Sequence, residues 1–304
     1  MLAIGIDIGG TNTKAGLVDL SSGYVTDSYV VSTEKKDPLE FITSLTGMIG
    51  QLRKKLKEKE SELRGVGVGV SSFVTSEGVV DSTYGFQEFM EDYPLVTLVE
   101  EQCNLPCRAD NDARVVALGE ALFGAGKKSD RVLVLTLGTG LGVGFVANRK
   151  FESPLAFGHM AGHMQIGPAE VSCYCGKTGC LEALVSASGI KNTALRSGWP
   201  GLRPEIPLEV ADIFKAEEMG DPLAVSVVDQ FITHLRAGIS NYINIFAPDV
   251  IVIGGGVSKG MGRHISRLTE SRTLKPFKRY EVQLRLSSLG DLAGILGSAA
   301  LFND

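Results

Sequence analysis

The sequence lacks long hydrophobic runs, a basic charge excess and low-complexity tracts. No apolar stretch approaches the roughly 20 residues of a membrane-spanning helix, so we expect no membrane partner. The formal net charge is -5, whereas nucleic-acid-binding domains normally present a basic face. The densest basic run, residues 53–57, precedes several glutamates and is typical of a solvated helix face. We therefore expect no nucleic-acid partner.

Export features are also missing. The apolar stretch after Met1 is short and has no basic leader, so no signal peptide is expected and the cytoplasm is the predicted compartment. The chain has five cysteines, an odd number, and three of them lie within residues 173–180. This crowding favours a metal site over a disulfide framework. Cys103 and Cys107 are predicted to be small apolar core residues.

Apolar and turn patterns predict an α/β chain in which one order of elements occurs twice. Strands are expected at 2–8, 13–20, 24–32, 64–70, 107–109, 131–137, 141–147, 249–253 and 281–286. Helices are expected at 38–60, from 94, at 111–123, at 222–246, after 256, and at 291–302. The repeated order predicts a duplicated α/β architecture of two lobes with a cleft between them.

The 304 residues suit two medium domains. We predict an N-terminal lobe at residues 1–123 and a C-terminal lobe at 124–290. The segment 151–207 fits neither half and is interpreted as an insertion that holds the metal ligands. The final helix, 291–304, is a candidate to pack back on the N-terminal lobe.

A glycine-rich turn follows the first predicted strand. Because glycine has no side chain, backbone N–H groups there can approach phosphate oxygens, and hydroxyl and ammonium groups add donors. The candidate ATP contacts are Asp7, Gly9, Gly10, Thr11, Thr13 and Lys14. Asp7, at the carboxyl end of the strand, can hold a hydrated Mg²⁺. A plain hairpin turn is the alternative, since Gly-Gly is common in hairpins.

Two more glycine loops lie in the second half. Gly138, Thr139 and Gly140 join two apolar strands, so this loop is neither a dinucleotide-binding turn nor a P-loop. Gly255 and Gly256 follow a later strand, where a phosphate or a flat ring can lie on backbone at a helix start. A tight strand-to-helix turn is the alternative for that loop. Two phosphate loops at equivalent positions predict ATP binding.

Three polar residues, Asp110, Asn111 and Asp112, occupy a predicted strand-to-helix junction. A carboxylate at such a junction can accept a proton from a substrate hydroxyl during phosphoryl transfer. Asp and Asn are also preferred helix N-caps, so one of the three is expected to cap the helix. Asp112 is the candidate general base.

A cluster of metal-ligand residues follows in the second half. His163, Cys173, Cys175 and Cys180 supply one imidazole and three thiolates, the closed tetrahedral set of a structural zinc site. A catalytic zinc would need an open position, which this set does not leave. Free thiols are the alternative.

These motifs together resemble the repressor–ORF–kinase (ROK) family of sugar kinases and related regulators. The resemblance covers nearly the whole chain and is most specific at 111–120, 138–142, 162–164 and 173–182. It implies a duplicated actin-like, hexokinase-type (ribonuclease H-like) fold whose two lobes close over sugar and nucleotide. It also implies a homodimer or homotetramer.

The same resemblance assigns roles to residues. Asp112 would activate a hexose hydroxyl, usually O6, for attack on the γ-phosphate of Mg-ATP. Asn111, His163 and Glu182 would hydrogen-bond the hexose, and His163 would complete a structural Zn site with the three cysteines.

The sequence departs from the family pattern on the sugar side. Met160 stands where the family usually has glutamate, and the adjacent His159 is a candidate substitute. Ser71 and Ser72 replace a Pro-Gly turn, and the usual sugar-binding segment is not recognisable in 81–94.

Two alternatives to a kinase follow from these departures and from the family. One is a catalytically weak or inactive sugar-binding protein. The other is a sugar-responsive regulator, for which we expect no DNA-binding domain because Asp7 closely follows Met1.

Overall fold

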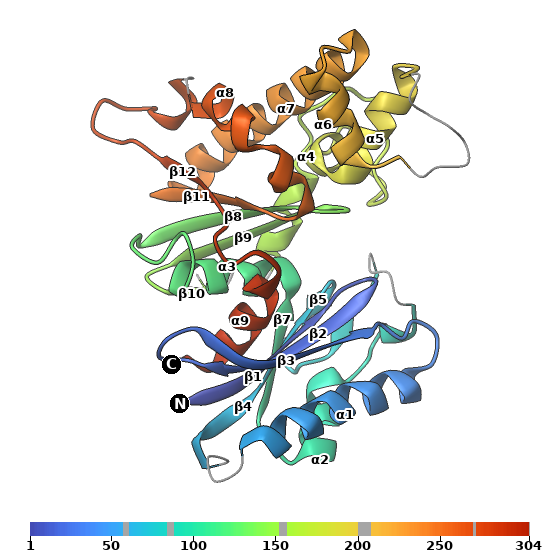
Figure 1. Cartoon of the computed structure of the whole chain (residues 1–304), viewed down its shortest axis with the longest axis vertical. Coiled ribbons are helices and arrows are strands. Elements are labelled where there is room, and N and C mark those ends of the chain that lie inside the picture. Colours follow the sequence, from blue (N-terminus) through green and yellow to red (C-terminus); the bar gives the residue numbers. More distant parts are fainter. Residues whose placement is uncertain (57–60, 84–87, 152–156, 200–207, 270–271, 304) are drawn as a thin grey trace. The chain divides into compact units, whose positions relative to one another are not determined.

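The computed structural model describes residues 1–56, 61–83, 88–151, 157–199, 208–269 and 272–303. The chain forms two compact units (Figure 1). Unit 1 contains Met1–Asp130, Gly144–His159 and Ser288–Asp304, and unit 2 contains Arg131–Val143 and Met160–Ser287. Unit 1 therefore extends beyond residue 123 and includes the C-terminal segment. Part of the predicted insertion at 151–207 lies outside the described residues.

Unit 1 is built on a five-stranded sheet of order β3-β2-β1-β4-β7. The two edge pairings on the β3 side are antiparallel, whereas β1, β4 and β7 are mutually parallel. The strands are β1 (Leu2–Ile8), β2 (Asn12–Asp19), β3 (Tyr24–Ser32), β4 (Leu63–Val70) and β7 (Cys107–Asn111). A small ribbon pairs β5 (Phe73–Val74) with β6 (Val80–Asp81). The unit's helices are α1 (Pro38–Leu56), α2 (Leu95–Cys103), α3 (Asp112–Leu122) and α9 (Ala293–Ala299).

Strand β1 is buried on both faces, which explains its nearly continuous apolar sequence. Successive side chains alternate between the two faces of the sheet. Ile4, Ile6 and Ile8 belong to the core shared with α1 and α2, whereas Ala3 belongs to the core shared with α9. By the same alternation, Asp7 lies on the α9 face.

Helix α1 follows its predicted pattern, because its buried residues recur at helical spacing. They are Phe41, Ile42, Leu45, Met48, Ile49, Leu52 and Leu56. The described helix begins at Pro38 as predicted, and its predicted extension to residue 60 lies outside the described residues.

Helix α9 lies against the sheet and α3 at backbone contact distance. A Cβ atom added at Gly67 of β4 would lie 1.8 Å from the Ser298 carbonyl oxygen. One added at Gly297 would lie 1.7 Å from the Val115 carbonyl oxygen. Only glycine permits such close approach, so these positions fix where α9 packs in unit 1.

The second sheet has the order β10-β9-β8-β11-β12, and the division between the units falls within β9, after Val143. Its strands are β8 (Arg131–Leu137), β9 (Leu141–Ala147), β10 (Lys150–Phe151), β11 (Val250–Gly254) and β12 (Gln283–Leu286). The helices of unit 2 are α4 (Leu181–Val185), α5 (Ala187–Arg196), α6 (Val210–Glu218), α7 (Pro222–Phe246) and α8 (Ile265–Thr269).

Helix α7 has the bounds that the sequence predicts. Asp221 caps its first turn by accepting from two backbone N–H groups, and Pro222 occupies a position where no N–H is needed. The region predicted as a helix after Gly256 begins with two 3₁₀ segments, Gly256–Gly260 and Gly262–His264, and becomes α-helical only at α8. Glycine disfavours a regular α-helix, which accounts for the difference. None of the described helices is both long enough and apolar enough to cross a membrane.

Candidate active-site residues and metal centre

The parallel strands of unit 1 align Asp7, Gly69 and Asp110 in register on β1, β4 and β7. Parallel strands end at the same sheet edge, where ligands of open α/β sheets commonly bind. The turns after these strands are therefore neighbours. They bring the carboxylate of Asp7 close enough to act electrostatically on that of Asp112.

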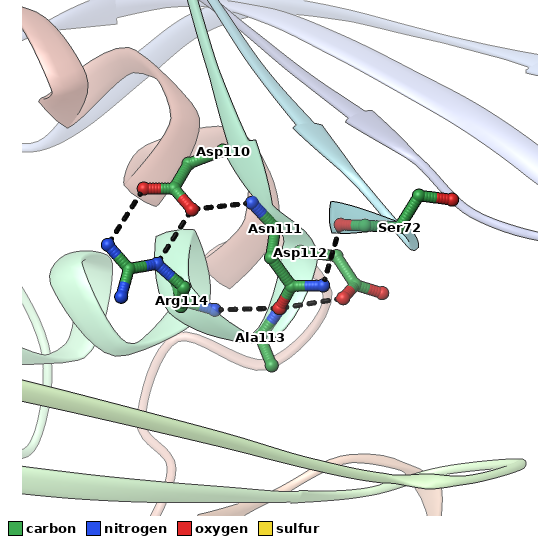
Figure 2. A network of polar contacts seen from close by, with 6 residues as sticks. All are labelled: Ser72, Asp110, Asn111, Asp112, Ala113 and Arg114. Atoms are coloured by element: carbon green, nitrogen blue, oxygen red, sulfur yellow. Dashed lines mark hydrogen bonds and ion pairs between the residues drawn. The ribbon is translucent and has the colours of Figure 1, made fainter. Parts of the chain in front are cut away.

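The three polar residues at the junction between β7 and α3 make different contacts (Figure 2). The Asn111 side chain caps α3, accepting from the Ala113 N–H at 3.0 Å, and donates to the Ser72 carbonyl at 3.1 Å. Asp110 pairs with Arg114, with 2.7 Å between Oδ1 and Nε. The expectation that one residue caps the helix is met by Asn111.

The Asp112 carboxylate accepts hydrogen bonds from the Ala113 backbone and from the side chains of Ser71 and Asn111. Its Oδ1 accepts from the Ala113 N–H at 2.7 Å, and the side chain is half-buried. Burial, followed by the charge of Asp7, raises the pKa of Asp112 to about 6. Such a carboxyl group is ionised at neutral pH yet basic enough to take up a proton, as general-base catalysis requires.

The carboxylate of Asp7 lies against α9, because a Cβ atom added at Gly294 would be 2.4 Å from its Cγ. Burial raises the pKa of Asp7, and the positive charge of Lys14 partly opposes that effect. Lys14 also lies 3.9 Å from the exposed carboxylate of Asp291. Asp7 is thus a carboxyl group near the edge of the sheet with one cation, Lys14, and one carboxylate, Asp112, nearby.

The first glycine turn is held by Thr33 of the neighbouring strand end. The Thr33 hydroxyl donates to the Gly9 carbonyl at 2.7 Å and lies 3.0 Å from the Thr13 hydroxyl. Thr13 is buried, so its hydroxyl supports the turn and does not face solvent. Gly10 and Thr11 are exposed, and their backbone is open to an approaching anion.

The glycine loops of unit 2 follow neighbouring parallel strands. Gly254 of β11 pairs in register with Thr136 of β8, so the loops that follow are adjacent. Gly255 has φ +85, and a Cβ atom there would lie 2.4 Å from the Leu137 carbonyl oxygen. Both its conformation and its packing therefore require glycine. Gly256 has open space on its Cβ side.

The loop of Gly138, Thr139 and Gly140 is adjacent to Glu182. The Glu182 Oε2 accepts from the Leu141 N–H at 3.0 Å and would lie 3.0 Å from a Cβ atom at Gly140. The structure thus brings a predicted sugar contact beside a predicted phosphate loop, within unit 2.

The four predicted metal ligands converge. Their ligand atoms all lie within 4.8 Å of one another, with 3.5 Å between Cys173 Sγ and His163 Nδ1 and 3.7 Å between the sulfurs of Cys175 and Cys180. A disulfide has sulfurs about 2.05 Å apart. Zn–S bonds of about 2.3 Å in a tetrahedron place sulfurs about 3.8 Å apart. These four residues therefore fit a tetrahedral zinc ion.

Electrostatics supports the same conclusion. Burial raises the pKa of Cys180 to about 12, and hydrogen bonds and charges from Cys175 and Cys173 contribute. Burial likewise raises the pKa of Cys173. The thiolates of Cys173 and Cys180 are thus costly without a cation, and a bound metal offsets that cost.

One residue in this region received no role from the sequence. The hydroxyl of Tyr174 lies 3.3 Å from His163 Nε2, the ring nitrogen that faces away from the cysteines. In the sequence, only its position between two predicted zinc ligands, Cys173 and Cys175, indicates that it lies near the metal centre.

The model of the ROK family matches residues 3–304. The chain belongs to the ROK family. It is 32% identical over 323 residues to a glucokinase of Halalkalibacterium halodurans, covering 98% of this chain and 94% of that protein.

Structural and regulatory relatives of this ROK chain are also similar along nearly its full length. A ROK family glucokinase from Streptomyces griseus, solved with glucose and AMPPNP, has 28% identity and a TM-score of 0.80, covering 99% of both chains. This similarity confirms the predicted actin-like, hexokinase-type fold. A xylose repressor of Caldicellulosiruptor bescii is 26% identical, covering 98% of this chain and 77% of the repressor.

Proposed function

We propose that this chain transfers the γ-phosphate of Mg-ATP to O6 of a hexose, with Asp112 as the general base. The coarser assignment, an ATP-dependent hexose kinase, rests on family membership and on glucokinase relatives that match nearly full length. The observation that carries the finer proposal is the Asp112 carboxylate, whose pKa of about 6 reflects burial and the neighbouring Asp7.

In the proposed step, the Asp112 carboxylate accepts the proton of the hexose hydroxyl as its oxygen attacks the γ-phosphorus. The bond from that phosphorus to the β,γ-bridging oxygen breaks, and ADP leaves with its electron pair. Asp7 and the glycine turn that follows it bind the Mg²⁺ and phosphates, with Thr11 and Lys14 as further donors. The loops at Gly138–Gly140 and Gly255–Gly256 bind the rest of the nucleotide.

On the sugar side, we propose that Asn111, His163 and Glu182 hydrogen-bond the hexose. The capping bond occupies the Asn111 Oδ1, so Asn111 can contact the hexose only through its NH₂ group, which also hydrogen-bonds the Ser72 carbonyl and the Asp112 carboxylate. Zinc held by His163 and the three cysteines would supply structure and no Lewis-acid chemistry, because four protein ligands close the site.

The test is ADP release, coupled to NADH oxidation, from zinc-loaded protein with Mg-ATP. The panel contains glucose, mannose, fructose, allose, N-acetylglucosamine and N-acetylmannosamine. Each sugar that turns over is then compared with its 6-deoxy analogue. We expect sugar-dependent ADP release that the 6-deoxy analogue and the Asp112→Asn protein both lack. Turnover of the 6-deoxy sugar would exclude O6 as the acceptor.

The alternative is a sugar-binding protein with weak or no turnover. It is motivated by Met160, which cannot hydrogen-bond as a glutamate would, and by the similarity to a repressor. Calorimetric hexose binding without any ADP release would favour this alternative. In that case, Met160→Glu is the first variant to test for restored turnover.

A further inference from the structure

The phenol of Tyr174 contacts the face of His163 that does not point at the cysteines. The two rings meet edge to face, with centroids 5.2 Å apart and an interplanar angle of 82°. The phenol oxygen is 3.3 Å from His163 Nε2, while His163 Nδ1 faces Cys173. Tyr174 therefore occupies the ring nitrogen that would otherwise be free to meet a ligand.

The same phenol also hydrogen-bonds the side chain of Glu182. Glu182 is buried, with 7% of its surface exposed, and its Oε2 already accepts from the Leu141 N–H. A phenol has one hydrogen and can accept as well. The hydroxyl of Tyr174 thus donates to the carboxylate and meets the imidazole nitrogen from one position.

These contacts exclude a simultaneous sugar contact at His163. An imidazole nitrogen makes one in-plane hydrogen bond, through either its hydrogen or its lone pair. With Tyr174 in place, Nε2 has no capacity left for a hexose hydroxyl. Tyr174 itself is 61% exposed, so its side chain can turn away with little loss of packing.

We propose that the hydroxyl of Tyr174 occupies the position of one hexose hydroxyl and is displaced when the sugar binds. This inference rests on the proposed function, in which His163 and Glu182 bind the hexose. An arriving sugar hydroxyl has the same donor and acceptor capacity as the phenol and restores both bonds. Tyr174 therefore favours sugars that carry a hydroxyl at that position, because only these can replace the phenol. It also weakens the binding of every such sugar, because the phenol must first be displaced.

The test is calorimetric titration of wild type and Tyr174→Phe with the hexose that gives turnover and with its monodeoxy analogues. Phenylalanine keeps the ring against His163 and removes only the hydroxyl. We expect the variant to bind the hexose about 3- to 10-fold more tightly, the equivalent of one net hydrogen bond. KM should fall in parallel while kcat stays within about two-fold, since the reaction at Asp112 is unaffected.

One monodeoxy analogue should show no gain, because it lacks the hydroxyl that replaces the phenol. Tyr24→Phe is the matched control, since Tyr24 is 66% exposed on β3, and it should change nothing. Zinc content by mass spectrometry should equal that of wild type in both variants.

Four outcomes would overturn the inference, three of them without affecting the proposed function. Unchanged affinity would show that the phenol does not compete, and weaker binding would make Tyr174 a sugar contact in its own right. An equal gain for every deoxy analogue would exclude a shared hydroxyl position. Absence of hexose binding in both proteins would remove the proposed function as well, whereas turnover with unaltered affinity would remove only this inference.

Discussion

Replacing Asp112 with asparagine separates the energetic cost of burying this carboxylate from its use in catalysis. Asparagine is nearly isosteric, and its Oδ1 can still accept from the Ala113 N–H that now lies 2.7 Å from the carboxylate. The negative charge is lost, and with it the repulsion from Asp7. Activity and stability should therefore change in opposite directions.

The size of the stability change follows from the pKa of Asp112, raised from 3.8 to about 6. Each pKa unit corresponds to about 1.4 kcal/mol, so the ionised side chain costs the fold up to about 3 kcal/mol. The half-buried position of Asp112 makes this an upper limit.

The sign depends on pH. Because the pKa of Asp112 is higher in the folded state than in the unfolded state, uptake of a proton by this group stabilises the fold. This stabilisation is complete below pH 3.8 and is lost as the pH rises through about 6. Asparagine does not titrate, so the stability advantage of the variant should be small at pH 4 and reach a plateau above about pH 6.5. Activity should fall by about 10²- to 10⁴-fold, as for loss of a general base.

Thermal and urea unfolding followed by circular dichroism at pH 4.5, 6 and 8 measures the stability change. Coupled ADP release measures the activity. Asp92→Asn is the matched control, because Asp92 is exposed and its φ of 55° suits asparagine. Activity of Asp112→Asn within a few-fold of wild type would refute its role as base. A stability difference that does not vary with pH would refute the burial argument.

Three further changes test other parts of the structure. Asp7→Asn removes a charge that raises the pKa of Asp112, so the acidic limb of the kcat/KM profile should move below pH 6 in whatever activity remains; an unmoved limb would contradict this electrostatic coupling. Cys175→Ser should lower bound zinc, measured by mass spectrometry, from about one ion per chain to a small fraction; full zinc content would eliminate Cys175 as a ligand. Gly297→Ala should destabilise the protein by at least about 2 kcal/mol, because the added Cβ atom would overlap the Val115 backbone. The control Gly47→Ala, in α1 with open space around it, should stabilise the protein by about 0.5–1 kcal/mol. Equal unfolding midpoints for the two variants would contradict the close packing of α9.

The local sequence was sufficient to predict the features that depend on residues close together along the chain. The bounds of β3 and α7 were predicted correctly, since period-2 or period-3.6 patterns and capping residues act within a few positions. The cysteine spacing in 173–180 likewise predicted a metal cluster, because a short turn with Gly176 and Gly179 brings its ligands together; both glycines have positive φ.

The tertiary structure decided which polar groups are left for chemistry. The sequence offered three candidates at the start of α3, and packing made Asn111 the cap and paired Asp110 with Arg114. Only the register of three parallel strands places Asp7 near Asp112, where its charge adds to the effect of burial in raising the pKa of that carboxyl group.

Contacts between distant segments decided the remaining details. Thr13 was predicted to be a phosphate contact, but it is buried and its hydroxyl lies 3.0 Å from that of Thr33, which follows β3. Tyr174 had no predicted role, and its contact with His163 exists only because the turn between the cysteines folds back on the imidazole. The sequence by itself therefore determined the elements, the loops and the ligand types, since these depend on residues close along the chain. Burial, pairing and electrostatic coupling depend on residues far apart along the chain, and only the folded protein brings those together.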